Sequence, residues 1–210
     1  MKIEEFANFI REIPYKNHAF DIYKEQWKIE SQQEYINQIF IKEVITLNRF
    51  NLFNSTDSIK KFVFKTLMWG YPTKGRGKNI ENILENKNLK ELIKILEGYK
   101  HNEISINQLG KDIKEISGVG LSTMTKFTHF LKTTINGNRA IILDLQIIAA
   151  INTGRFEELN QLKGISYENA IKKYDEYLFI INDLSKKINV EVDQIEIFLF
   201  TFGRTLSEIN

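Results

Sequence analysis

The chain has 210 residues, with 29 Lys and Arg against 27 Asp and Glu, and it contains no cysteine. This length indicates one or two domains, and a hydrophobic content of 42% favours a folded globular protein over a disordered one. A net charge of only +2 means that any nucleic-acid site must be a local basic patch. Without cysteine there is no ligand for a cysteine-bound iron–sulfur cluster or zinc ion, and we expect no cofactor.

The sequence also favours an intracellular location. No apolar run approaches the length of a membrane span, and the first residues lack the basic and apolar regions of a signal peptide. The absence of cysteine is consistent with a reducing compartment. We therefore expect a cytoplasmic protein with no membrane partner.

The first 57 residues read as amphipathic helices that pack on a core formed by residues 58–210. Apolar residues at helical spacing follow one another in two stripes, separated by Pro14. The stripes are Ile3, Phe6, Phe9 and Ile10, then Tyr35, Ile36, Ile39, Phe40 and Val44. A further strongly helical segment is predicted from Ser58 to Trp69.

The stretch from Trp69 to Lys78 combines aromatic and basic residues with three glycines and a proline. Such a loop suits phosphate contact and base stacking. Lys74 and Arg76 are candidates for binding DNA, and Trp69 and Tyr71 are candidates for a base pocket. The alternative is a solvated connection between helices whose lysines only add solubility.

Helical spacing resumes over 79–96 and again up to Ile116, where Ser117-Gly-Val-Gly120 interrupts it. A second helical pattern begins at once with Leu121. Two helices joined by a turn with paired glycines predict a helix-hairpin-helix, whose exposed backbone N–H groups can hold a phosphate oxygen. The candidate DNA-binding residues here are Gly118, Val119, Gly120 and Thr123.

A polar turn over 133–139 leads into the apolar run Ala140–Leu143, Asp144 and a helix over 145–151. A carboxylate between two apolar runs is costly unless it caps the helix or has a chemical role. An amphipathic segment over 156–179 and a buried helix over 194–203 complete the chain. Because no strand-like alternation is sustained, we predict an all-α fold.

The glycine turn Gly118–Gly120, the helix after it and the run Ile141–Asp144 resemble the helix-hairpin-helix, Gly/Pro…Asp superfamily of DNA glycosylases. The nearest branch is that of 8-oxoguanine DNA glycosylase-fold proteins. The resemblance implies a monomer that binds double-stranded DNA, turns a base out of the duplex and removes it. A damaged or modified purine such as 8-oxoguanine is the favoured substrate.

The resemblance assigns a catalytic role to Asp144, whose charge would stabilise the sugar as the base leaves. The lysine nucleophile of the bifunctional members is replaced at its aligned position by Ser122. Lys126 lies one helical turn later, and its side chain leans back towards Ser122. Either Lys126 attacks the sugar, which would add abasic-site lyase activity, or water attacks it.

Three more residues near this motif have open roles. His129 and Gln146 are candidates for the base pocket, and Arg139 for phosphate binding; His129 is equally well explained as a satisfied polar residue at the edge of the core. A non-catalytic DNA-binding module remains the main alternative, favoured by Ser122 and disfavoured by Asp144. A glycosylase that acts on modified foreign DNA in defence is a third reading.

Overall fold

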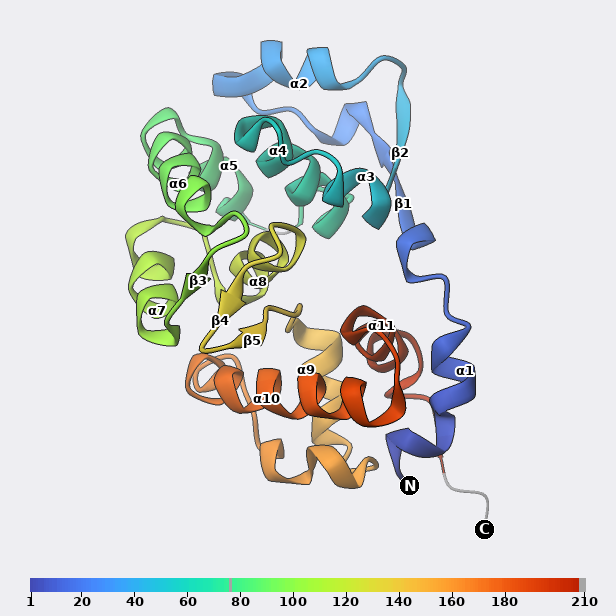
Figure 1. Cartoon of the computed structure of the whole chain (residues 1–210). Helices are drawn as coiled ribbons and strands as arrows, with labels where there is room; N and C mark the ends of the chain where they lie inside the picture. The colour runs from blue at the N-terminus through green and yellow to red at the C-terminus, as the bar shows by residue number, and fades with distance from the viewer. Residues whose placement is uncertain (76, 208–210) are drawn as a thin grey trace.

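The computed structural model describes residues 1–75 and 77–207, and these form a mostly helical structure with two small sheets (Figure 1). The α-helices are α1 (Ala7–Arg11), α2 (Gln33–Ile39), α3 (Arg49–Phe53), α4 (Ile59–Gly70), α5 (Asn79–Leu84), α6 (Asn86–Tyr99), α7 (Ile106–Glu115), α8 (Leu121–Phe130), α9 (Leu145–Asn152), α10 (Ala170–Ile188) and α11 (Val192–Phe202). The strands are β1 (Ala19–Tyr23), β2 (Val44–Asn48), β3 (Glu103–Ile104), β4 (Thr134–Ile135) and β5 (Asn138–Arg139). Short 3-10 helices span Ile3–Phe6, Tyr15–Asn17, Lys24–Gln26, Glu30–Gln32 and Glu157–Leu162.

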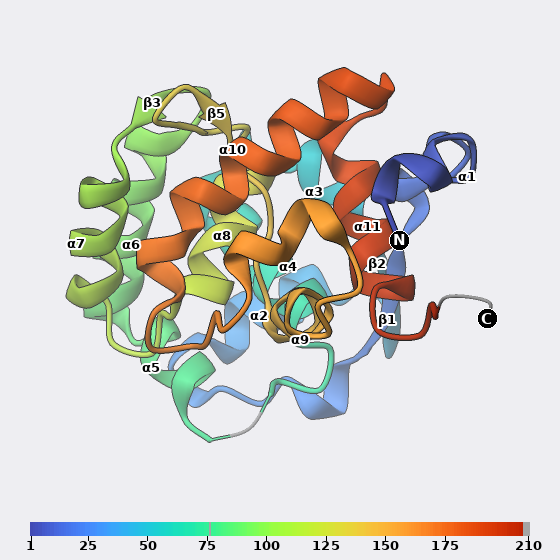
Figure 2. The same ribbon diagram turned by 90° about the horizontal axis from the view of Figure 1, so that it is seen from below.

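The chain starts beside its own C-terminal helix and then crosses the molecule (Figure 1). α1 packs on α11, and β1 carries the chain to the opposite end, where β2, α2 and α4 lie. α5, α6 and α7 follow along one side, and α8 passes through the middle. The chain then returns through α9, α10 and α11 to the end at which it began, which Figure 2 shows from below. The N-terminal segment therefore contacts both ends of the molecule.

α4 and α8 form the centre of the core. The Ser58 side chain accepts a hydrogen bond from the Lys61 backbone and caps α4, as expected for a serine at this position. Most of α4 is buried, and every residue of α8 except Ser122 is buried. Phe62 and Phe127 meet across the two helices with ring centroids 6.0 Å apart. A helix buried on all sides holds its polar side chains in fixed places, and α8 carries several of them.

The prediction of an all-helical N-terminal segment is wrong, because β1 and β2 pair as an antiparallel sheet. Ile22 pairs with Ile45, and both are buried, as is Leu47 two residues further along β2. Alternation of buried and more exposed residues over five positions is the pattern of a strand. Val44, assigned to a helical stripe, begins β2. The β-branched residues of this run fit a pleated strand better than a helix.

The residues predicted as a polar turn over 133–139 form the hairpin of β4 and β5, and β3 adds to it in parallel. The turn consists of Asn136 and Gly137, with φ values of 47° and 77°. Asn-Gly with positive φ at both positions is the preferred two-residue connection between antiparallel strands. The all-α class is therefore too strict, and the fold is mostly helical with small sheets.

Two other segments differ from prediction in their limits or continuity. Extended backbone at Glu85 divides the helix predicted over 79–96 into α5 and α6. The segment over 156–179 begins as a 3-10 helix, and α10 starts only at Ala170. The helices predicted over 145–151 and 194–203 are confirmed as α9 and α11. Within the described ranges, no helix has the length and apolar character needed to cross a bilayer.

Candidate active site

Two pockets meet at Asp144. The turn pocket, of about 200 Å³, is lined by the loop after α4, the turn before α8 and the start of α9. Its residues are Tyr71, Lys74, Gly75, Asn79, Ile80, Ile83, Gly118, Gly120, Leu121, Ser122, Thr123, Leu143, Asp144, Leu145, Ile148, Tyr167 and Ala170. The deep pocket, of about 50 Å³, is lined by His18, Phe20, Arg49, Trp69, Gly70, Lys126, Ile142, Asp144, Glu196 and Phe200.

Asp144 is the N-cap of α9. Its Oδ1 accepts hydrogen bonds from the backbone N–H groups of Gln146 at 2.9 Å and Ile147 at 3.1 Å. These bonds fix the carboxylate and expose it to the positive end of the helix dipole. Both bonds use the same oxygen, which leaves Oδ2 available to the two pockets that Asp144 lines. The cap and a chemical role are therefore compatible.

The amine of Lys126 reaches back one helical turn to Ser122. Its Nζ donates to Ser122 Oγ at 2.9 Å and to the Ser122 carbonyl oxygen at 3.1 Å. The side chain is only 5% exposed, so its stem lies within the protein. Lys126 lines the deep pocket and Ser122 lines the turn pocket, and the amine therefore stands at the wall between them.

Gly70 and Tyr71 at the end of α4 determine the path of this lysine. A Cβ at Gly70 would lie 2.8 Å from Lys126 Cδ and 3.1 Å from Cε, so only glycine leaves the stem its present course. The Tyr71 ring lies 5.4 Å from Nζ, within reach of a cation–π interaction. The Tyr71 hydroxyl is 2.6 Å from Thr123 Oγ1, which orients the ring.

The turn between α7 and α8 is anchored in the core and tightly packed. Val119 is buried, and Gly118 has a φ of 89°, where a side chain would also collide with the Asn79 carbonyl. A Cβ at Gly120 would lie 2.5 Å from the Tyr167 hydroxyl. Gly120 is the N-cap of α8 and offers no side-chain acceptor to its first N–H groups, and Gly120, Leu121 and Ser122 line the turn pocket.

The loop after α4 supplies one described cation to this pocket. Lys74 has a φ of 62° and pairs with Glu81 at 2.6 Å, while its Nζ lies 3.5 Å from the Lys28 carbonyl oxygen. Arg76 lies outside the described residues. Within the ranges 1–75 and 77–207, the loop therefore brings Tyr71 and Lys74 to the turn pocket, whereas Trp69 faces the deep pocket.

The family comparison extends this picture to nearly the whole chain. Residues 14–200 match the family model described as "Putative 8-oxoguanine DNA glycosylase OGG-like protein". The chain belongs to this OGG-like family. The resemblance inferred from the central motif is thereby confirmed, and the matched range includes every residue that lines either pocket. Neither the search of curated proteins nor the search of solved structures found a match.

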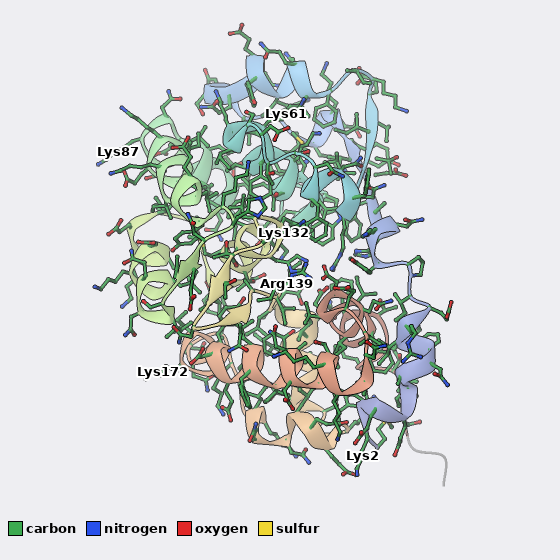
Figure 3. All side chains as sticks on the ribbon, in the orientation of Figure 1. Lys2, Lys61, Lys87, Lys132, Arg139 and Lys172 are labelled. Carbon is green, nitrogen blue, oxygen red and sulfur yellow. The ribbon has the colours of Figure 1, made fainter. Side chains whose placement is uncertain are left out.

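Three residues predicted for the site of this OGG-like protein lie apart from both pockets. Gln146 is exposed and accepts a hydrogen bond from Arg204 at 2.7 Å. Arg139 lies between the β4–β5 hairpin and α11 (Figure 3), and its guanidinium is 2.8 Å from Asp193 Oδ2. His129 is completely buried. His129 therefore lines neither pocket, and its assignment to a base pocket stays a prediction.

His129 contacts a backbone carbonyl and a buried carboxylate in the core. Its Nδ1 lies 3.2 Å from the Ala140 carbonyl oxygen, and its Nε2 lies 3.1 Å from Asp193 Oδ1. Both ring nitrogens therefore face oxygen atoms of the protein. Burial tends to raise the pKa of Asp193, but the positive charges of His129 and Arg139 outweigh it and lower that pKa. The three residues form a closed ionic cluster.

Sequence reasoning missed most of the deep pocket of this family member. Its walls come from β1, the start of α3 and the end of α11, which are remote from the central motif. Glu196 did carry a signal, because it interrupts an apolar run just as Asp144 does. Arg49, His18 and Phe20 carried none, since the segment that contains them was interpreted as helical.

Proposed function

We propose that this OGG-like protein is a DNA glycosylase that turns a damaged purine out of the duplex and removes it, with 8-oxoguanine as the favoured base. The observation that carries the proposal is the hydrogen bond from the Lys126 amine to the Ser122 hydroxyl, formed by two residues that each line a pocket with Asp144. An amine and a carboxylate next to a cavity can act as nucleophile and charge stabiliser in the cleavage of a glycosidic bond.

In this proposal α7, the glycine turn and α8 act as a helix-hairpin-helix that holds the DNA backbone. The uncapped start of α8 supports this role, because free N–H groups at a helix N-terminus bind phosphate oxygens. Lys74 would add a phosphate contact from the neighbouring loop. The turn pocket would then receive the sugar and phosphate, and the deep pocket would receive the extruded base.

Asp144 would act on the sugar. Positive charge develops on the deoxyribose as the bond between C1′ and the base breaks, and a fixed carboxylate lowers the energy of that state. The two backbone N–H groups that hold Oδ1 keep the carboxylate in place before the substrate arrives. Oδ2 is the oxygen that would face the sugar.

We propose Lys126 as the nucleophile. The neutral amine would form a bond to C1′ while the bond from C1′ to the base breaks, and the electron pair and a proton would leave with the base. Opening of the sugar ring would then give a Schiff base and lyase activity. The contact between Nζ and Ser122 Oγ supports this assignment, because it brings the amine to the residue that aligns with the lysine of the bifunctional members.

The experiment is base release from duplexes that each carry one modified base, with 8-oxoguanine, 8-oxoadenine and uracil in the panel. Heating in alkali converts every abasic site to a strand break, which reports base removal whichever nucleophile acts. We expect breaks at 8-oxoguanine that are absent with Asp144→Asn. DNA binding without base release from any duplex would contradict the proposal and indicate a non-catalytic DNA-binding module.

A further inference from the structure

We infer that Arg49 and Glu196 read the edge of the extruded base and select purines that carry a 6-oxo and a 2-amino group. This inference rests on the proposed function, since it takes the deep pocket as the base pocket. It goes further by naming the two residues that determine specificity. Neither residue belongs to the central motif.

Arg49 and Glu196 form a buried ion pair at the deep pocket. Arg49 is the first residue of α3, Glu196 lies on α11, and each side chain is only 1% exposed. Their Nη1 and Oε2 atoms are 2.5 Å apart. The Arg49 guanidinium carbon lies 5.2 Å from the centre of the Trp69 ring, which also lines the pocket. The pair thus joins the N-terminal segment to the C-terminal helix at the cavity.

Part of the hydrogen-bonding capacity at this pair is not used within the described residues. Arg49 Nη1 and Glu196 Oε2 contact each other, whereas Arg49 Nε and Nδ1 of the neighbouring His18 are buried without a hydrogen-bond partner. A buried polar group left without a hydrogen bond costs about 1–3 kcal/mol. Two such atoms beside a buried ion pair, all in residues that line one cavity, indicate a site that a polar ligand completes.

The remaining walls indicate that the ligand is flat. The aromatic rings of Phe20, Trp69 and Phe200 line the same cavity, and Phe200 lies one helical turn after Glu196. Aromatic rings beside hydrogen-bonding groups are the means by which proteins hold an extruded base. Burial and the charge of Arg49 lower the pKa of His18 to about 4, so the imidazole adds no further charge at neutral pH.

The chemistry of the pair fits one purine edge. A carboxylate accepts from the N1–H and 2-amino groups of guanine together, while a guanidinium donates to O6. 8-Oxoguanine has this same edge, whereas adenine lacks the paired donors. The cavity of about 50 Å³ has room for roughly four water molecules. A purine is larger than this cavity, so it enters only when the half-buried rings of Phe20 and Phe200 move aside.

The test compares wild type with Glu196→Gln under single-turnover conditions on three duplexes. They carry 8-oxoguanine, 8-oxohypoxanthine, which lacks only the 2-amino group, and 8-oxoadenine. We expect wild type to prefer 8-oxoguanine and Glu196→Gln to lose roughly 10- to 100-fold on that base, with much smaller changes on the other two. Glu191→Gln, which changes the exposed carboxylate just before α11, is the matched control and keeps the preference.

Two outcomes would overturn the inference: an equal loss on all three bases, which indicates a structural ion pair, or an unchanged preference. The double variant Arg49→Gln/Glu196→Gln covers a folding failure, because two amides can bond to each other without charge; it too should lose the preference. If wild type releases no base, the proposed function fails by itself. Equilibrium binding of free 8-oxoguanine and free 8-oxoadenine then tests recognition by Arg49 and Glu196 directly. Equal affinities for the two bases would refute the inference.

Discussion

Lys126 and His129 lie three residues apart on α8, yet their surroundings differ completely. The Lys126 amine contacts a hydroxyl, a carbonyl and an aromatic ring, and no carboxylate is paired with it in the described structure. His129 instead faces Asp193, which in turn binds Arg139. One helix thus holds an amine at the edge of a cavity and a histidine that joins a largely buried ionic cluster. The difference separates a group available for chemistry from groups fixed for stability.

The largest effect is expected at the two pockets beside Lys126, where Asp144 caps α9. Asp144→Asn keeps a side chain that caps helices well but removes the charge. We expect base release to fall roughly 10²- to 10³-fold while DNA affinity stays within a few-fold. Single-turnover rates and equilibrium binding to an 8-oxoguanine duplex measure the two quantities. A rate close to that of wild type would show that Asp144 is only a cap.

In the ionic cluster of His129, Arg139 and Asp193, a substitution should lower the free energy of unfolding. Asp193→Asn leaves His129 and Arg139 without their shared anion, and breaking a buried ion pair costs about 3–5 kcal/mol of unfolding free energy. Glu191→Gln is the matched control, because this exposed carboxylate lies 3.7 Å from the same arginine and should cost less than ~1 kcal/mol. Denaturant titration at neutral pH compares the two. Similar losses of unfolding free energy in the two variants would show that the ionic cluster does not stabilise the fold.

The pH dependence of this stability follows from the same cluster. The pKa of Asp193 is lower in the folded protein than in the unfolded chain, so the unfolded chain takes up its proton first as the pH falls. The contribution of Asp193 is complete above its unfolded pKa of about 3.9 and is lost as the pH falls below that value. Wild type should lose this contribution in acid, whereas Asp193→Asn lacks it at every pH.

A smaller effect is expected where the two helices touch. Gly70→Ala places a methyl group against the Lys126 stem and should displace the amine. We expect a roughly 10-fold loss of base release, since misplacement of a reacting group by about 1 Å is costly. Gly98→Ala in α6 is the control, because its Cβ would meet no atom within 4 Å. The proposed role of the amine would be weakened if both variants kept wild-type rates.

The smallest effect concerns the DNA backbone. Lys74→Ala should weaken duplex binding several-fold for every sequence and reduce the salt dependence by about one ion. Lys87→Ala is the control, because this exposed lysine projects outward from the start of α6 (Figure 3). The substitution should leave both quantities unchanged. Titrations at several salt concentrations measure the two slopes. Equal slopes for Lys74→Ala and wild type would remove Lys74 from the interface.

The sequence predicted the central elements well because their signals are local. The glycine turn, the cap at Asp144 and the apolar helix α11 each depend on residues a few positions apart. The same reasoning predicted the reach of Lys126 towards Ser122, since helical geometry determines it.

The deep pocket could not be predicted in this way. It joins β1 and α3 to α11 across most of the chain, and a single sequence contains no information on such distant contacts. The strand pattern of β2 was present but short, and helical spacing of the neighbouring apolar residues concealed it. His129 illustrates the opposite limit, because its neighbour Asp193 is 64 positions away and determines its role.

The most direct test of the account is borohydride trapping on an 8-oxoguanine duplex. Reduction fixes a Schiff base, so wild type should give a covalent protein–DNA adduct, and Lys126→Gln should give neither adduct nor strand cleavage. Ser122→Ala, which removes the hydroxyl but keeps the lysine, should still form the adduct. Base release by wild type without any adduct, or an adduct that survives Lys126→Gln, would contradict the assignment of Lys126 as the nucleophile.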